Sequence, residues 1–205
     1  MTSDGNSITT IPRKVKLGVL GSGAGTNFVA LARAIAEGAV QAEVVLVLSD
    51  VATAGIFQRA AEFGIPGAFV DPGPFETKLG DAAQTEMARR FQEAGVEFII
   101  CAGFMRRLKA PVLDLWARRI LNIHPSLLPA FPGRDAPGQA LAAGVGETGC
   151  TVHLVDEGID SGEILAQSVV PIVPGDTRAE VIARINAAEQ ALYPAVIQSF
   201  IHRNA

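Results

Sequence analysis

The sequence predicts an α/β protein with a Rossmann-like, mostly parallel sheet, flanking helices, a C-terminal antiparallel hairpin and a long final helix. Three observations lead to this fold class. Short apolar runs alternate with segments of helical periodicity along most of the chain. These runs lack the polar alternation of half-exposed strands, which is typical of parallel strands covered by helices on both faces. Near the C-terminus, two runs are joined by a segment too short for a crossover helix.

The parallel part of the predicted sheet consists of five apolar runs. They are Val15 to Leu20, Val44 to Ser49, Gly67 to Val70, Phe98 to Ala102 and Ile120 to Ile123. The helices predicted between them are Asn27 to Glu37, Gly55 to Phe63, Glu76 to Ala94 and Pro111 to Trp116. Right-handed crossovers through such helices place ligands at the carboxyl ends of the strands.

In the C-terminal part, strands no longer alternate with helices. Cys150 to Val155 and Ile164 to Val170 are predicted to form the hairpin, with an acidic loop between them. Thr177 then has the character of a helix N-cap, and Glu180, three residues later, completes a capping box. We therefore expect the final helix to run from this point toward Phe200.

Length and composition indicate one globular domain. The chain has 205 residues, of which 49% are hydrophobic, and we expect a flexible segment over 1–13 and a single domain over 14–205. The formal net charge of -4 argues against a broad surface for nucleic acids or anionic membranes. Both cysteines, Cys101 and Cys150, lie in apolar runs, which favours reduced core thiols and a cytoplasmic location. No apolar segment approaches the roughly 20 residues that span a bilayer.

The first candidate site is the pair Asn122 and His124, in the sequence Leu-Asn-Ile-His-Pro-Ser-Leu-Leu-Pro that starts at Leu121. In an extended segment, two residues separated by one point to the same side. Pro125 favours this extended geometry for the residue before it. An amide beside an imidazole, whose ordinary pKa is near ~6.5, suits chemistry on a carbonyl: the amide can hold an oxyanion and the imidazole can move a proton.

The second candidate is the glycine-rich turn from Gly21 to Asn27, between the first strand and the first helix. Backbone N–H groups at such a helix start can hold a phosphate. The turn lacks the third glycine of a dinucleotide-binding loop and the lysine of a Walker loop. Asp50, at the end of the second strand, resembles the acid that binds a ribose, so a nicotinamide enzyme stays a competing interpretation. A tight turn that only needs glycine dihedrals is the other.

The third candidate is the acidic hairpin loop. If this loop shares the edge of the sheet with the Asn122–His124 pair, a carboxylate such as Asp160 could pair with His124 and favour its imidazolium form. The calcium-loop pattern is absent and the three histidines are scattered, so we expect no metal site. His153 is interpreted as a strand histidine with satisfied hydrogen bonds.

With these motifs the chain resembles the folate-dependent formyltransferases, above all the phosphoribosylglycinamide formyltransferases of purine biosynthesis. The resemblance spans Lys16 to Phe200. Besides the three candidates it rests on Ala-Gly-Phe-Met-Arg at 102–106 and Thr-Val-His at 151–153. It implies formyl transfer from 10-formyltetrahydrofolate to the glycyl amine of N1-(5-phosphoribosyl)glycinamide. It also implies small-molecule substrates, no metal, no nucleic acid or membrane partner, and a homodimer as a candidate assembly.

The resemblance assigns roles residue by residue. The implied catalytic residues are Asn122, His124 and Asp160. The implied ribonucleotide-binding residues are Gly25, Thr26, Asn27 and Glu189. The implied folate-binding residues are Lys78, Met105, Arg106, Arg107, Leu108 and, again, Asn122.

The chain departs from the family pattern downstream of the catalytic pair. Many relatives have histidines after the Pro-Gly at 132–133, where this chain reads Arg134 to Gly138, and Gln190 stands where histidine is frequent. A sugar-nucleotide N-formyltransferase, or another enzyme that uses 10-formyltetrahydrofolate, is therefore the alternative. Methionyl-tRNA formyltransferase would need an added domain and a basic surface, and formyltetrahydrofolate hydrolase an extra N-terminal domain. A catalytically silent folate- or nucleotide-binding module is the interpretation from a different class.

Overall fold

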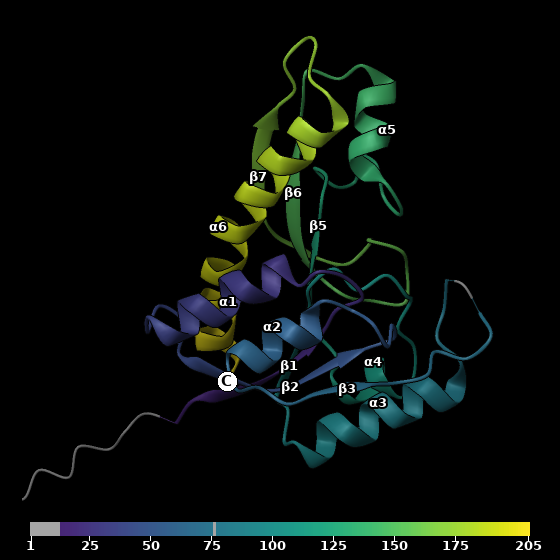
Figure 1. Cartoon of the computed structure of the whole chain (residues 1–205), viewed down its shortest axis with the longest axis vertical. Helices are drawn as coiled ribbons and strands as arrows, with labels where there is room; N and C mark the ends of the chain where they lie inside the picture. The colour runs from purple at the N-terminus through teal and green to yellow at the C-terminus, as the bar shows by residue number, and fades with distance from the viewer. Residues whose placement is uncertain (1–12, 76) are drawn as a thin grey trace, which may run out of the picture.

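A computed structural model describes residues 13–75 and 77–205, and its centre is a seven-stranded mixed sheet (Figure 1). The strand order is β3-β2-β1-β4-β5-β6-β7. The strands are β1 Val15–Leu20, β2 Ala42–Ser49, β3 Gly67–Phe69, β4 Phe98–Cys101, β5 Ile120–His124, β6 Glu147–Leu154 and β7 Ile164–Pro171. The first five run parallel, whereas β5–β6 and β6–β7 pair antiparallel. The predicted fold class is confirmed.

Helices cover the sheet on both sides. They are α1 Thr26–Ala36, α2 Ile56–Glu62, α3 Asp81–Glu93, α4 Val112–Leu115, α5 Ala136–Ala143 and α6 Arg178–Asn204. Buried residues of α1, α2 and α6 pack on one face, and those of α3 and α4 pack on the other. The strands supply both cores because successive side chains point to opposite faces: Leu17 and Val19 face the first core, and Leu20 faces the second.

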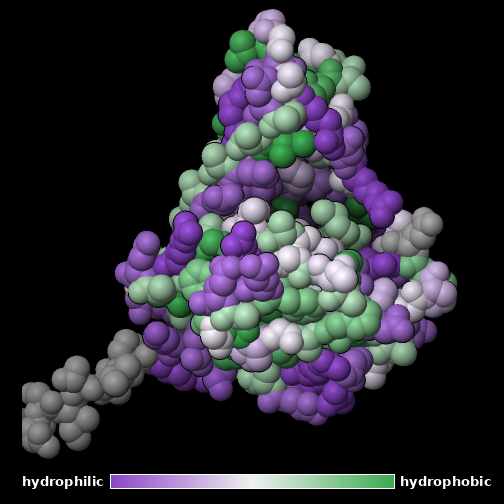
Figure 2. Space-filling view, viewed as in Figure 1, coloured by the Kyte–Doolittle hydropathy of each residue, from purple (hydrophilic) through white to green (hydrophobic). Residues whose placement is uncertain are grey.

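Helix α3 is amphipathic, with charged residues on its outward face and apolar residues on its inward face. Glu86 pairs with Arg89 at 2.8 Å and with Arg90 at 2.6 Å, while Met87 and Phe91 are buried. This face forms part of the hydrophilic surface at the lower edge of Figure 2. No helix among the described residues is both long and apolar enough to cross a membrane.

Several predicted boundaries need correction. The helix predicted from Glu76, a residue outside the described part of the chain, starts at Asp81, because Lys78 instead forms an isolated parallel bridge to Arg107. The hairpin strands extend to Glu147 at one end and Pro171 at the other. The predicted flexible segment 1–13 lies outside the described residues except for Arg13, whose guanidinium pairs with Glu97.

Helix α5 was not predicted from the sequence. Its second and third residues are Pro137 and Gly138, which weaken the helical pattern. Proline is nevertheless favoured in the first turn of a helix, and Asp135 caps it by accepting a hydrogen bond from the Gly138 amide at 3.2 Å. The Asp135 cap and Pro137 are the sequence features from which α5 could have been predicted.

Candidate active site

The catalytic candidates lie around β5, at the centre of the carboxyl edge of the sheet. Asn122 pairs in register with His153 of the neighbouring β6, and His124 pairs with Thr151. Asn122 is half-buried and His124 is 5% exposed. The chain then turns sharply at Pro125, so both side chains stand where the strand ends and a ligand can approach.

Two acceptors flank the His124 imidazole. Its Nε2 is 2.9 Å from the carbonyl oxygen of Phe131, and its Nδ1 is 3.3 Å from Oδ2 of Asp160. A neutral imidazole carries only one N–H and would turn a lone pair toward one of these oxygens. A ring that carries hydrogen on both nitrogens can donate to both oxygens, so the site has room for the charge that the ring could carry during a reaction.

Asp160 brings the hairpin loop into the site. It has a φ of 52°, a left-handed conformation that aspartate tolerates better than most residues, and its side chain is 15% exposed. Its Oδ2 also accepts a hydrogen bond from the Gly133 amide at 2.8 Å. The carboxylate therefore holds both the imidazole and the loop that wraps around it.

His153 is part of the same cluster, which the interpretation as a strand histidine did not foresee. Its Nδ1 donates to the carbonyl oxygen of Leu154 at 2.8 Å, and its Nε2 accepts from Nδ2 of Asn122 at 3.1 Å. Burial lowers the pKa of His153, which keeps the ring neutral and Nε2 an acceptor. His153 thereby fixes which way the Asn122 amide points. Only the pairing register of β5 and β6 reveals this, and no local sequence pattern predicts that register.

The glycine-rich turn leads into the N-terminus of α1. Gly25 has a φ of 78°, and a Cβ there would lie 3.0 Å from the Ile56 Cα, so the turn requires glycine. The cap has no side-chain hydrogen bond, which leaves the first-turn amides without a capping group. This arrangement suits an anion.

Glu189 reaches this turn from α6. Its Oε2 accepts a hydrogen bond from Nδ2 of Asn27 at 2.9 Å. Burial raises the pKa of Glu189 to about 7, although the bond from Asn27 acts in the opposite direction. The Oδ1 atom of Asn27 is buried and has no hydrogen-bond partner among the described residues, so it can accept a bond from a ligand.

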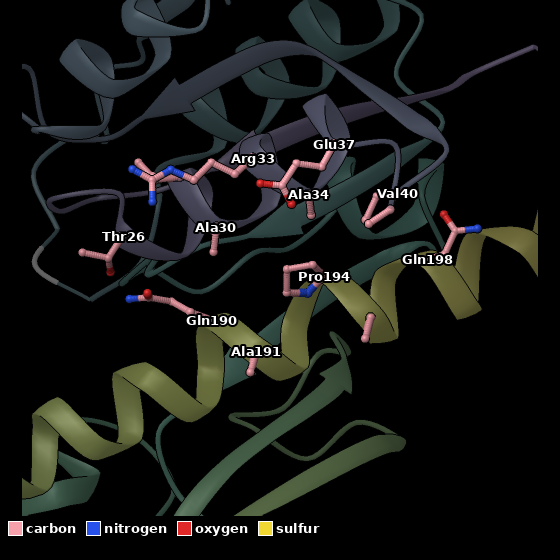
Figure 3. Close-up of a pocket in the computed structure, with 13 residues that line it drawn as sticks. Thr26, Ala30, Arg33, Ala34, Glu37, Val40, Gln190, Ala191, Pro194 and Gln198 are labelled. Carbon is pink, nitrogen blue, oxygen red and sulfur yellow. The ribbon is translucent and has the colours of Figure 1, made fainter.

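A groove of about 740 Å³ is lined by residues of α1 and α6, where the two helices meet (Figure 3). Thr26 and Gln190 stand at the same end of it, so Gln190 lies beside the glycine-rich turn. The other departure from the family pattern, at 134–138, has a structural explanation. Asp135 caps α5 and pairs with Arg178 of α6 at 2.6 Å.

The residues predicted to bind folate occupy two adjacent segments. The amide of Arg107 donates to the Thr77 carbonyl at 3.2 Å, which ties the segment after β4 to the one before α3. The Lys78 ammonium lies 4.1 Å from the centre of the Phe75 ring. Met105 is 63% exposed, as a ligand contact would be before binding. Leu108, in contrast, is buried in the core and offers a ligand almost no surface.

Asp50 is not placed to bind a ribose. One carboxylate oxygen accepts from the Ser22 hydroxyl and the other from Nε of Arg106, each at 2.6 Å. Both oxygens are engaged inside the protein, and the side chain is 3% exposed. The interpretation of this residue as a nicotinamide-enzyme acid is therefore wrong.

Residues 15–197 match the family model described as formyl transferase. The chain is 46% identical over 185 residues to the trifunctional purine biosynthetic protein adenosine-3 of Drosophila pseudoobscura pseudoobscura. That match covers 89% of this chain but 13% of the fly protein. The phosphoribosylglycinamide formyltransferase of Bacillus subtilis is 40% identical, with 92% of this chain and 96% of that protein covered. The crystal structure of glycinamide ribonucleotide transformylase 1 from Symbiobacterium toebii superposes with a TM-score of 0.90 at 40% identity, covering 98% of this chain and 94% of that one.

Proposed function

This chain belongs to the formyl transferase family, and we propose that it is a phosphoribosylglycinamide formyltransferase of purine biosynthesis. The observation that carries the proposal is the match over nearly the whole length of the Bacillus subtilis enzyme, at 40% identity. The trifunctional relatives are purine biosynthetic proteins by name, and this chain spans 13% to 14% of the first two of them.

We propose that the reaction joins the glycyl amine to the formyl carbon and breaks the bond between that carbon and the folate nitrogen. The Asn122 amide has two hydrogens, of which His153 binds one. The second is left to donate to the formyl oxygen as negative charge develops there. The neighbouring His124 imidazolium, supported by Asp160, stabilises the same charge.

The proton lost by the amine must reach the departing folate nitrogen. Phe131 and Asp160 face the two ring nitrogens of His124, so a transfer through this ring requires one of these contacts to open. Transfer through a water molecule leaves the contacts intact. A proton from either route balances the reaction, which releases tetrahydrofolate and the formylated amide.

The two substrates are proposed to occupy neighbouring half-sites at the carboxyl edge of the sheet. The turn at Gly25, Thr26 and Asn27, together with Glu189, would hold the ribonucleotide, and Asn27 Oδ1 offers it a buried acceptor. Lys78 and the segment Met105 to Leu108 would hold 10-formyltetrahydrofolate. The homodimer and the cytoplasmic location stay predictions.

The deciding experiment offers the protein 10-formyltetrahydrofolate with either glycinamide ribonucleotide or an amino-sugar nucleotide, and follows the release of tetrahydrofolate. We expect turnover with glycinamide ribonucleotide alone. Turnover only with the sugar nucleotide would replace the proposed acceptor, and binding without turnover of either would favour a silent binding module.

A further inference from the structure

Asp50 is a buried carboxylate that bonds to two different loops at the carboxyl edge of the sheet. It follows β2, and its side chain is 3% exposed. Oδ1 accepts a hydrogen bond from Ser22, which precedes α1, and Oδ2 accepts one from Arg106, which follows β4. Burying a charge is costly unless it is paired, so both partners are needed to keep this carboxylate inside.

The bond to Ser22 fixes the glycine-rich turn against the segment after β4. The Ser22 hydroxyl donates to Asp50 at 2.6 Å and accepts from the Met105 amide at 3.1 Å. The Ser22 amide also donates to the Gly103 carbonyl at 3.1 Å. Because the Ser22 hydroxyl donates its hydrogen to Asp50, the lone pairs of the Ser22 oxygen can accept the hydrogen bond from the Met105 amide.

The bond to Arg106 fixes a third segment. The Arg106 Nη1 donates to the Phe75 carbonyl and lies 3.4 Å from the Lys78 carbonyl, while its Nε bonds to Asp50. The planar guanidinium holds these directions rigidly, which a lysine ammonium would not. The segment that carries Lys78 is thus connected to Asp50 through one side chain.

We propose that Asp50 is a positioning residue that couples the two substrate half-sites. This inference rests on the proposed function, because the loops it joins are those assigned to the ribonucleotide and to the folate. A ligand that holds the glycine-rich turn in place also holds Ser22. Through the bonds of Asp50 to Ser22 and Arg106, it restrains the segment assigned to the folate as well. Binding of one substrate therefore favours binding of the other, and the effect is reciprocal.

The coupling can be measured by titration calorimetry with tetrahydrofolate, which carries no formyl group and cannot react. We expect glycinamide ribonucleotide to tighten tetrahydrofolate binding about 5-fold or more in the natural protein, the lower end of typical coupling. The double variant Asp50→Asn/Arg106→Gln removes both charges and leaves none unpaired. In this double variant, the dissociation constants of tetrahydrofolate measured with and without glycinamide ribonucleotide should become nearly equal, so their ratio approaches one. Ser22→Ala should lower the ratio to a lesser degree. An unchanged ratio in the double variant, or a ratio of one in the natural protein, would overturn the coupling.

Hydrogen exchange of the ligand-free protein separates this inference from the proposed function. The amides of Met105 and Arg107, which bond to Ser22 and Thr77, should exchange faster in the double variant. Glu62→Gln, which breaks the exposed pair with Arg59, is the matched control and should leave both amides protected. Unchanged exchange in the double variant would refute the positioning role even if the enzyme is active. Failure of the natural protein to bind either substrate would instead refute the proposed function.

Discussion

At the scale of single residues, the proposed reaction depends on two side chains, Asn122 and His124, with different chemical roles. Asn122 supplies a directed N–H, and His124 supplies charge. Loss of one oxyanion donor typically lowers turnover by roughly 10²–10³, and loss of a positioned acid or base by about 10²–10⁴. We expect Asn122→Ala and His124→Ala each to lower kcat within these ranges.

Neither change touches the glycine-rich turn, so the affinity for glycinamide ribonucleotide should stay nearly constant. Steady-state kinetics and calorimetry measure the two quantities separately. Thermal unfolding of each variant shows whether the buried His124 is also needed for stability. Near-normal kcat in a folded variant would contradict the assigned role.

Asp160 is the charged partner of His124. Its carboxylate lies 3.3 Å from Nδ1 of the ring, where it orients the imidazole and stabilises the positive charge that the proposed reaction places there. Asp160→Asn keeps the shape of the side chain but removes its charge, so kcat should fall while the affinity for glycinamide ribonucleotide stays nearly constant. Steady-state kinetics and calorimetry measure these two quantities, and an unchanged kcat would remove Asp160 from the mechanism.

At the scale of elements, α6 carries a pH-dependent contribution to stability through Glu189. Burial raises the pKa of this carboxyl from 4.5 to about 7, so between these values the folded state binds the proton more tightly than the unfolded state. Stability therefore falls as pH rises through this window, and the cost of burying the charge is complete above pH 7. With 1.36 kcal/mol per pKa unit, this cost is up to about 3 kcal/mol.

Glu189→Gln removes that titration and keeps a hydrogen-bonding side chain. The free energy of unfolding of this variant, relative to the natural protein, should rise between pH 5 and pH 8.5. Urea denaturation at the two pH values measures this difference. The exposed Glu62→Gln change on α2 should show no such trend. A difference that does not depend on pH would mean that Glu189 does not titrate in this window.

The elements also show how far the sequence predicts the structure. Apolar runs predicted all seven strands, and the signal is strongest in a strand such as β4, which is buried on both faces and continuously apolar. The capping box at Thr177 predicted the start of α6 correctly. Helix α5 was missed because Pro137 and Gly138 weaken its helical pattern, and the Asp135 cap is a single-residue signal.

The candidate site was predicted less completely than the fold. Asn122 and His124 share one strand, so their proximity follows from local geometry. The contact of His153 with Asn122 depends on a pairing register between distant segments, and Asp50 joins three loops through tertiary contacts. Such contacts have no signature in a local pattern.

At the scale of the whole molecule, the sheet sets both half-sites along one edge, so substrate binding should stabilise the entire domain. A ligand that binds only the folded state adds RT ln(1 + [L]/Kd), about 2.7 kcal/mol at 100 times Kd. For a domain of 150–250 residues, 1 kcal/mol shifts the midpoint by roughly 2–4 °C. We expect glycinamide ribonucleotide at that concentration to raise the Tm by about 5–11 °C, whereas an amino-sugar nucleotide at equal concentration should produce almost no shift. A shift with both would show that the turn at Gly25 to Asn27 recognises phosphate without selecting the rest of the acceptor. Discrimination between the two acceptors would then have to arise beside Gln190, where this chain departs from the family pattern. In that case Gln190→His should increase the difference between the Tm shifts that the two acceptors produce.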